Sequence, residues 1–236
     1  MARKSIEAMV QRLNDIHEIQ NVMSLHEYYH TAGMHKEEVE EIWAQKTPGV
    51  SWETGDLGRF EGIEAIRRIY VEGKEIIGKI NLKAMRELYP EIEDDRKNMF
   101  IGTMNIHMLT TPMIEVAVDG KTAKGIWMSP GQVTQLMNGK LTACWMWEKY
   151  AVDFVKEDEK WKIWHFHVFT DFMTSYDKSW VENSLGPKLP PTFPPDFPKS
   201  NKPMTVDYPQ YSPFTTPKNH PRPPAPYETF NDTFSY

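Results

Sequence analysis

The segment from Cys144 to Thr170 constrains the fold more than any other part of the chain. It contains two runs rich in Trp, Tyr, Phe, Val and Ile, separated by the fully charged stretch 156–160. Aromatic and β-branched residues on both sides of a short polar segment are typical of a β-hairpin. The segment therefore predicts two long antiparallel strands joined by a turn centred on residues 157–158.

The position of this turn decides which side chains lie together, because side chains alternate between the two faces of a strand. It predicts three cross-strand pairs: Phe154 with Trp161, Tyr150 with His165, and Glu148 with His167. One face is then apolar apart from a carboxylate, a phenol and two imidazoles at one end, and it holds Met146, Glu148, Tyr150, Val152, Phe154, Trp161, Ile163, His165, His167 and Phe169. A carboxylate in an apolar wall must be paired, protonated or functional. This face predicts an apolar pocket with an acid/base cluster at its mouth.

The opposite face of the hairpin places Asp153 across from Lys162, a favourable pair that supports the same register. It also carries four large aromatic residues: Trp145, Trp147, Trp164 and Phe166. Such a surface is too apolar for open water. We therefore expect it to be a subunit interface in a dimer or larger oligomer.

Composition narrows the class of protein. The chain has 236 residues, a formal charge of −6 and one cysteine, Cys144. The acidic balance argues against a nucleic-acid partner, and one cysteine excludes an intrachain disulfide or a multi-cysteine zinc site. The N-terminal residues show no signal-peptide pattern, and no run approaches the ~20 apolar residues of a membrane span. We expect a cytoplasmic protein without a membrane partner.

Helical patterns precede residue 99 and strand patterns follow it. Ser5 can cap a helix that runs to about Ala32 and stops at Gly33. Its predicted buried face consists of Ile6, Met9, Val10, Leu13, Ile16, Ile19, Val22, Met23 and Tyr29 or His30. Further predicted elements are helices 35–45 and 62–73, short strands at 50–53 and 59–62, a partly helical insertion at 74–98, and strands 101–109, 113–118 and 122–128. Glu37, Glu38, Glu40 and Glu41 are expected to face solvent. Helices followed by a meander of strands predict an α+β fold with an antiparallel sheet.

The C-terminal part differs sharply in composition. Fourteen of the 18 prolines lie in residues 187–236, interleaved with aromatic residues. Proline prevents helix and central strand, whereas a free tail would be poor in aromatic residues. We expect a domain at 1–180 and an extended arm at 181–236 that packs on its own domain or on a partner subunit.

Several short segments together carry a family resemblance: Tyr28-Tyr29, residues 57–66 (LGRFEGIEAI), His107-Met108-Leu109, residues 114–123 (IEVAVDGKTA), 154–158 and 161–163. In this order they resemble the nuclear-transport-factor-2-like superfamily, in its SnoaL-type and scytalone-dehydratase-like branch. The resemblance covers about residues 5–172. It implies a cone, in which a curved sheet wraps around N-terminal helices and encloses an open-ended apolar pocket.

The resemblance also implies chemistry, because relatives of this kind remove water or shift protons without a cofactor. Tyr29 matches the helix-one tyrosine of the family and His107 the strand histidine, while Ala32 stands where an aspartate is usual. Glu148 is then the expected source of the missing carboxylate. The predicted catalytic residues are His107, Tyr29, Glu148, His165 and Tyr150, and the predicted pocket residues are Tyr28, Trp52, Met146, His167 and Phe169.

These expectations favour a cofactor-independent lyase, dehydratase-like or small-carbonyl-eliminating, that acts on a hydrophobic hydroxylated aromatic or polycyclic small molecule. Two alternatives remain open. One is a non-catalytic small-molecule-binding dimer of the same fold. The other is a metalloenzyme in which His107, His165, His167 and Glu148 bind the ion, although no distinctive metal signature accompanies them.

Overall fold

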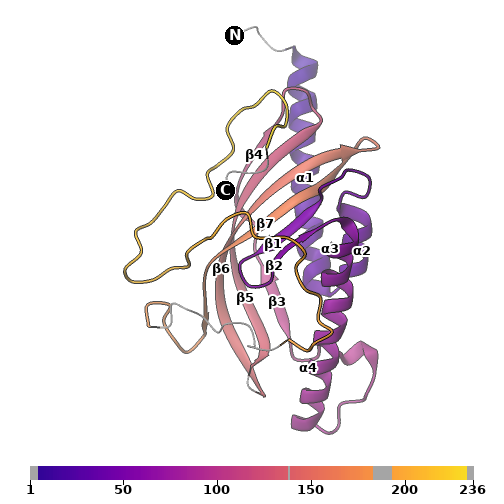
Figure 1. The fold of residues 1–236 in the computed structure, drawn as a ribbon, viewed down its shortest axis with the longest axis vertical. Coiled ribbons are helices and arrows are strands. Elements are labelled where there is room, and N and C mark those ends of the chain that lie inside the picture. The colour runs from indigo at the N-terminus through magenta and orange to yellow at the C-terminus, as the bar shows by residue number, and fades with distance from the viewer. Residues whose placement is uncertain (1–4, 138, 183–192, 233–236) are drawn as a thin grey trace.

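The computed structural model describes residues 5–137, 139–182 and 193–232, which form helices packed against one face of a seven-stranded sheet (Figure 1). The strand order is β2-β1-β7-β6-β5-β3, with β4 also paired to β5. The helices are α1 (Ile6–Ala32), α2 (His35–Ile42), α3 (Ile63–Arg67), a π-helical segment (Arg68–Gly73), α4 (Lys74–Leu88) and a 3-10 turn (Arg96–Asn98). The strands are β1 (Ser51–Thr54), β2 (Gly58–Glu61), β3 (Met104–His107), β4 (Thr110–Val116), β5 (Thr122–Met137), β6 (Lys140–Glu157) and β7 (Lys160–Ser175).

The α+β class with a curved sheet around N-terminal helices is confirmed, but the sheet is mixed rather than purely antiparallel. Strand β1 runs parallel to β7, with Trp52 opposite Phe166. A parallel pair needs a long crossover between its strands, and here more than a hundred residues, which include the five strands β2 to β6, separate the two. The early strands predicted near residue 50 therefore extend the sheet at the far side of β7.

Helix α1 begins and ends where its sequence predicts. The Ser5 hydroxyl accepts a hydrogen bond from the Ala8 amide at 3.2 Å, and Gly33 closes the helix with a φ of +70°. The predicted apolar face is wrong over the first turns, because Ile6 and Leu13 are 71% and 67% exposed. Figure 1 shows this end of α1 running past the ends of the strands, so no sheet is available there to cover it.

The β6–β7 hairpin turns one residue later than predicted. Asp158 and Glu159 occupy the turn, with φ of +49° and +61°, and Glu157 pairs with Lys160. Two positive φ values match the turn type whose twist suits a two-residue hairpin. The predicted pair of Phe154 with Trp161 is therefore wrong, and Phe154 pairs with Ile163.

Two irregularities shift the register again further along the hairpin, between Asp153 and Phe154 and between Trp147 and Glu148. The observed pairs are Asp153 with His165, Tyr150 with Val168, and Glu148 with Thr170. An extra residue in one strand exchanges the faces of all residues beyond it. The predicted pairs of Tyr150 with His165, Glu148 with His167, and Asp153 with Lys162 are consequently wrong. Glu148 and Tyr150 face the helices, whereas His165, His167 and Phe169 lie on the outer face.

The main core lies between the helices and the inner face of the sheet, and it includes Trp43, Phe60, Ile66, Phe154 and Phe166. Phe166 is only 1% exposed in this core, so its expected place in a subunit interface is wrong. The ring of Trp164 is covered by Phe230 at 4.6 Å between centroids. Of the predicted interface residues, Trp145 and Trp147 keep substantial exposure, at 38% and 41%.

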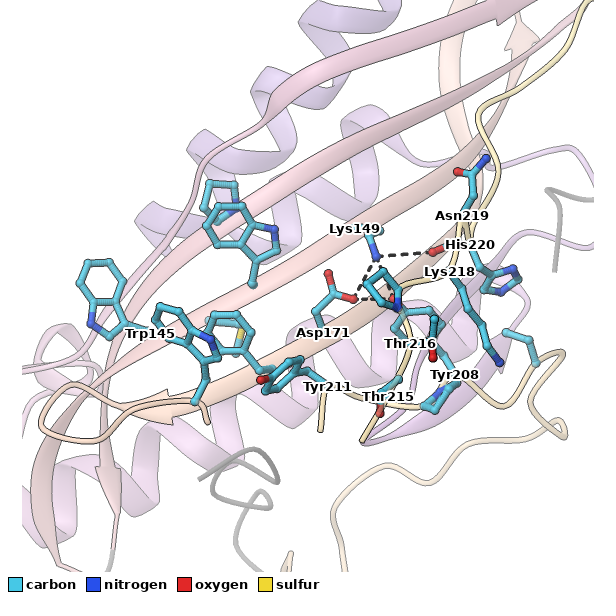
Figure 2. Close-up of a pocket in the computed structure, with 18 of the residues that line it drawn as sticks. Trp145, Lys149, Asp171, Tyr208, Tyr211, Thr215, Thr216, Lys218, Asn219 and His220 are labelled. Atoms are coloured by element: carbon cyan, nitrogen blue, oxygen red, sulfur yellow. Dashed lines mark hydrogen bonds and ion pairs between the residues drawn. The ribbon is translucent and has the colours of Figure 1, made fainter. Parts of the chain in front are cut away.

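The described part of the proline-rich arm crosses the outer face of the chain's own sheet (Figures 1 and 2). The Lys149 ammonium bridges the two, since it contacts Asp171 on β7 at 2.9 Å and the Tyr208 hydroxyl of the arm at 2.8 Å. Farther along, the Val118 amide donates to the Tyr227 carbonyl at 3.0 Å. Residues 183–192 and 233–236 lie outside the described residues, and the division into a 1–180 domain and an arm stays a prediction.

The docking of the arm can be tested at Thr205. Its amide and hydroxyl donate to the two carboxylate oxygens of the buried Glu53, at 2.7 and 2.8 Å. Thr205→Val leaves one buried oxygen without this donor, so we expect a loss of about 1–3 kcal/mol of unfolding free energy and faster proteolysis within the arm. Urea denaturation and limited proteolysis measure both effects. Thr216→Val, at an exposed arm position, serves as the control; equal behaviour of the two variants would show that the arm is not held at Glu53.

Candidate active site

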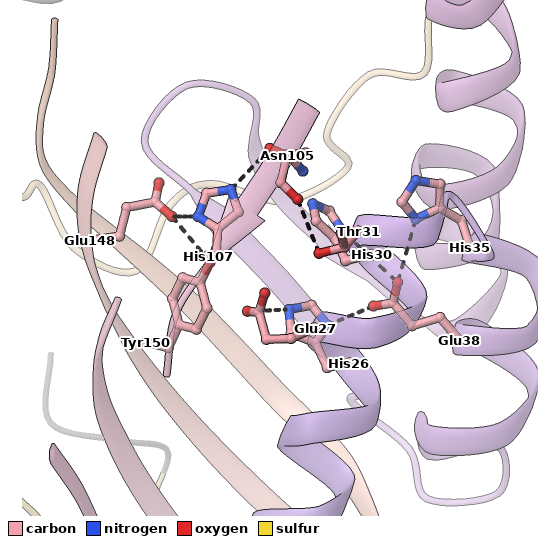
Figure 3. A network of polar contacts seen from close by, with 10 residues as sticks. All are labelled: His26, Glu27, His30, Thr31, His35, Glu38, Asn105, His107, Glu148 and Tyr150. Atoms are coloured by element: carbon pink, nitrogen blue, oxygen red, sulfur yellow. Dashed lines mark hydrogen bonds and ion pairs between the residues drawn. The ribbon is translucent and has the colours of Figure 1, made fainter. Parts of the chain in front are cut away.

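His107 at the end of β3 is the centre of a buried polar cluster on the inner face (Figure 3). Its Nδ1 lies 3.4 Å from a carboxylate oxygen of Glu148 on β6, and its Nε2 lies 3.1 Å from the side-chain oxygen of Asn105. The imidazole is 8% exposed and the carboxylate residue 6%. A carboxylate beside one ring nitrogen orients an imidazole for proton transfer at the other.

Glu148 is itself held in place by two hydroxyl groups. Tyr150 donates to one carboxylate oxygen at 3.2 Å, and Thr170 on β7 donates to the other at 2.9 Å. Burial, followed by the nearby charge of Glu148, raises the pKa of Tyr150 well above its ordinary value. Tyr150 therefore remains a neutral phenol that supports the carboxylate. His107, Glu148 and Tyr150, three of the five predicted catalytic residues, are thus brought together.

Helix α1 contributes a second carboxyl group, that of Glu27, to the same interior. Figure 3 shows Glu27 below His107, between Tyr150 and His26. Both of its oxygens are buried and have no hydrogen-bond partner among the described residues. Burial raises the pKa of Glu27, and the opposing charges of His26 and His107 only partly offset that effect. A raised pKa makes the protonated form of a carboxyl group easier to reach, so Glu27 is suited to act as an acid.

A third carboxylate, Glu38 of α2, lies among three imidazoles. Its oxygens are 2.7 Å from Nδ1 of His26, 3.4 Å from Nδ1 of His35 and 3.9 Å from Nδ1 of His30. Burial alone would raise the pKa of Glu38, but the imidazoles, His26 first, hold it well below the ordinary value. Glu38 is fully buried, so its predicted solvent-facing position is wrong.

The predicted residues of helix one point elsewhere. The Tyr29 hydroxyl donates to Glu41 at the surface, at 2.5 Å, and Tyr28 is 75% exposed. The prediction left Tyr29 or His30 as the last inward residue of this helix and assigned the catalytic role to Tyr29. In the structure the inward residues at this end are polar, namely His26, Glu27 and His30, because α1 packs there against the polar cluster rather than against an apolar wall.

The remaining predicted site residues also lie apart from His107. His165 contacts Asp153 at 2.9 Å on the outer face, and His167 stacks on Phe169 beneath the arm, with ring centroids 3.9 Å apart. This placement corrects the predicted catalytic role of His165 and the predicted pocket roles of His167 and Phe169. It also separates the proposed metal-binding set, because His165 and His167 lie on the opposite face from His107 and Glu148.

Two further predicted pocket residues do not lie beside His107. Trp52 packs in the main core, 5.4 Å from the ring of Tyr70 between centroids. Met146 packs against a separate small core with Cys144 and Met173, and it also lines a hollow on the outer face. Neither residue contacts the polar cluster through any described interaction.

The sequence contained a signal for the residues that the prediction missed. On α2 the buried residues are His35, Glu38, Val39 and Ile42, which follow the three-four spacing of one helix face. The apolar members of this stripe mark the buried face, and the histidine and glutamate on the same stripe are buried with them. If all residues on this face of the helix are assigned to the interior, polar or not, Glu38 is predicted to be buried.

A large hollow of about 1570 Å³ lies on the outer face, between the sheet and the arm (Figure 2). Half-exposed aromatic residues form one end, including Trp145, Trp147 and Trp180, and the Lys149–Asp171–Tyr208 contact lies at the other. An aromatic wall with a few polar groups is typical of small-molecule sites, although this hollow is larger than their usual volume of about 300–1,000 Å³. The polar cluster at His107 and this hollow are on opposite faces of the sheet.

Comparison with known proteins shows which family the chain resembles. The SnoaL-like domain family matches residues 11–167, which is more than half of the chain. The chain belongs to the SnoaL-like domain family. This confirms the resemblance expected from the short motifs. A search of curated proteins gave no match for this chain.

Two solved structures share the fold. A hexachlorocyclohexane dehydrochlorinase (LinA) type 2 aligns over 72% of this chain and 94% of its own, with 15% identity and a TM-score of 0.51. A scytalone dehydratase-like protein from Novosphingobium aromaticivorans aligns over 72% and 93%, with 12% identity and a TM-score of 0.52. At these sequence identities the similarity shows the fold alone.

Among the described residues, no helix has the length and apolar character needed to cross a membrane.

Proposed function

We propose that this SnoaL-like protein is a lyase that eliminates water or a small carbonyl compound from a hydrophobic, hydroxylated aromatic or polycyclic small molecule by general acid–base chemistry. The observation that carries the proposal is the pairing of His107 with Glu148 in an interior that also holds the buried carboxyl group of Glu27. Among the described residues that carboxyl group makes no hydrogen bond, and its nearest ion-pair partner is His26 at 3.8 Å. The names of the two similar structures, a dehydrochlorinase and a dehydratase-like protein, support elimination as the reaction class. This chemistry needs no cofactor.

In a dehydration, His107 removes a proton from the carbon next to a carbonyl group, and Glu148 stabilises the imidazolium that forms. Glu27 then gives its proton to the leaving hydroxyl group. The C–H and C–O bonds break, a C=C bond forms, and water leaves. In the carbonyl-eliminating variant His107 takes the hydroxyl proton, a C–C bond breaks, and Glu27 protonates the carbon left behind.

Aromatic rings lie beside His107 on the inner face of the sheet. The ring of Tyr150 is 6.4 Å from the imidazole and 5.0 Å from the ring of Phe166, measured between centroids. We place the substrate on this inner face, with its reacting carbon at Nε2 of His107 in place of the contact with Asn105.

The proposal is tested by incubating the protein with a panel of β-hydroxy aryl ketones and aryl propanediols. Mass spectrometry detects the loss of water or formaldehyde, and intrinsic tryptophan fluorescence detects binding. Turnover of at least one panel compound supports the lyase. Binding of panel compounds without turnover would support the alternative, a binding protein of the same fold.

Glu27→Gln tests the assignment of the acid. We expect turnover of an active panel compound to fall by about 10²-fold or more, because an amide cannot give up the proton. Thermal stability should be unchanged or higher, since the substitution removes an ionisable group that burial disfavours. In the wild type the rate should fall as the pH rises through the raised pKa of Glu27, and this alkaline limb should be absent in the variant. An alkaline limb that persists in Glu27→Gln would assign the acid to another group.

Ligand binding without chemistry is the second candidate function, and the hollow on the outer face favours it. Trp145 and Trp147 form part of its wall, so a flat aromatic ligand would quench their fluorescence. Trp145 and Trp147 also belong to the surface on which we expect self-association. The dimer stays a prediction, and sedimentation velocity measures the oligomeric state.

A further inference from the structure

We propose that His30, His35 and Glu38 form a binding site for one divalent transition-metal ion of the zinc class, at the corner where α1 meets α2. The ligand atoms would be Nδ1 of each histidine and the carboxylate oxygen Oε2. Two imidazoles and one carboxylate, with a further position open to water, are a donor set that such ions take readily. The site differs from the metal-binding set considered from the sequence, and it lies beyond the proposed lyase chemistry.

The distances among the three ligand atoms fit an ion better than they fit hydrogen bonds. Oε2 of Glu38 is 3.4 Å from Nδ1 of His35 and 3.9 Å from Nδ1 of His30. One ligand atom from each of the three residues lies within 4.8 Å of the other two. Hydrogen bonds between such groups are about 2.7–3.2 Å long. Two ligands bound at about 2.0–2.2 Å from a zinc ion in tetrahedral geometry are roughly 3.3 Å apart. Small side-chain movements would therefore complete the site.

An unsatisfied ligand atom provides an independent observation. Nδ1 of His30 is buried and has no hydrogen-bond partner within the described part of the chain. It belongs to the cluster around Glu38, as Figure 3 shows. Leaving a buried polar atom unbonded costs stability, and such atoms call for an explanation. A bound ion would supply the missing partner.

The surroundings of the two imidazoles favour their neutral forms. Burial lowers the pKa of His30 well below its ordinary value and lowers that of His35; Lys74 acts in the same direction, and Glu38 acts in the opposite one. A neutral imidazole is the form that binds a metal ion.

His26 completes the arrangement as an outer partner. Its Nδ1 contacts the other oxygen of Glu38, Oε1, at 2.7 Å. Partners of this kind orient a ligating carboxylate and leave its second oxygen for the ion. An ion held there would link α1 to α2, while the acid–base chemistry at His107 proceeds with or without it.

The test uses tag-free full-length protein that has been stripped with a chelator and then titrated with Zn²⁺ by calorimetry and with Co²⁺ by absorption spectroscopy. We expect one equivalent to bind with submicromolar affinity, and the Co²⁺ spectrum to show d–d bands of a nitrogen- and oxygen-ligated ion. His30→Ala and His35→Ala should each weaken Zn²⁺ binding by at least about 10- to 100-fold, the loss that even outer partners cause. His17→Ala, which removes an exposed imidazole from the same helix, should bind as the wild type does.

His30→Ala is the deciding variant because Nδ1 of His30 makes no hydrogen bond in the structure, so the substitution should fold even if His35→Ala does not. Absence of stoichiometric binding to the wild type overturns the proposal. Unchanged affinity in His30→Ala also overturns it, because the ion would then lie elsewhere. His107→Gln separates the two proposals: it should abolish turnover and leave Zn²⁺ affinity unchanged.

Discussion

His107→Gln is expected to reduce turnover of any panel compound that the protein eliminates by about 10²- to 10⁴-fold, the range that a positioned general base contributes. Glutamine is close to histidine in size and can keep polar contacts with Glu148 and Asn105, but it cannot accept a proton at neutral pH. Binding should persist, because the substrate's apolar contacts do not depend on the imidazole. The expected signature is a large fall in kcat with KM changed by less than about tenfold.

Steady-state kinetics with the most active panel compound measures this effect. His17→Gln, at an exposed position on α1, is the matched control and should retain full turnover. Two results would contradict the assignment. One is equal activity of His107→Gln and the wild type, and the other is a rise in KM with kcat preserved, which would make His107 a binding residue only.

The parts of the fold that local sequence patterns determine were predicted well. Ser5 and Gly33 predicted both ends of α1, because a side-chain cap and a left-handed residue act within a few residues of the chain. The strands of the hairpin were also predicted, since their aromatic and β-branched content is high. These signals are local, so a single sequence is enough to find them.

The hairpin register could not be predicted from the hairpin alone, because residues distant in sequence contact it at the first irregularity. Trp164 lies at the first irregularity, where its indole donates to the Pro48 carbonyl at 2.9 Å and packs on Phe230 of the arm. Neither partner is close in sequence. A shift of one residue moved His165 and His167 to the outer face, and with them half of the predicted acid/base cluster.

The inward face of α1 was misassigned at its C-terminal end for a different reason. Apolar spacing left Tyr29 or His30 as the inward residue there, and the catalytic role was assigned to Tyr29, whereas His30 is the one that lies inside. The buried stripe is Asp15, Ile19, Met23 and His26, which mixes charged and apolar residues at a regular spacing. A stripe of this kind indicates a polar interior. At this end of α1, the spacing along the helix identifies the buried residues better than their polarity does.

Acidification from pH 7 to 4 is expected to destabilise the protein strongly, and His167 on the outer face is a main cause. Burial, with smaller effects from the charges of His220 and Arg59, lowers its pKa from 6.5 to about 3. In the unfolded chain the same imidazole binds a proton near pH 6.5, so between pH 6.5 and 3 the unfolded state holds more protons. Stability therefore falls with pH by about 1.4 kcal/mol per unit, or roughly 3 kcal/mol by pH 4. That is a large part of the about 5–15 kcal/mol that holds a typical domain folded.

Urea denaturation of the wild type and His167→Gln at several pH values between 7 and 4 measures this contribution. The variant should be somewhat less stable at pH 7, because it loses the stacking on Phe169, and it should gain relative to the wild type by roughly 3 kcal/mol at pH 4. His17→Gln should follow the wild-type curve throughout. Tyr208 and His220 of the arm pack on Phe169 beside the imidazole, with ring centroids 5.2 and 5.4 Å away, so we expect the arm to contribute to its burial. Parallel curves for the wild type and His167→Gln would therefore show that the arm does not cover this face in solution.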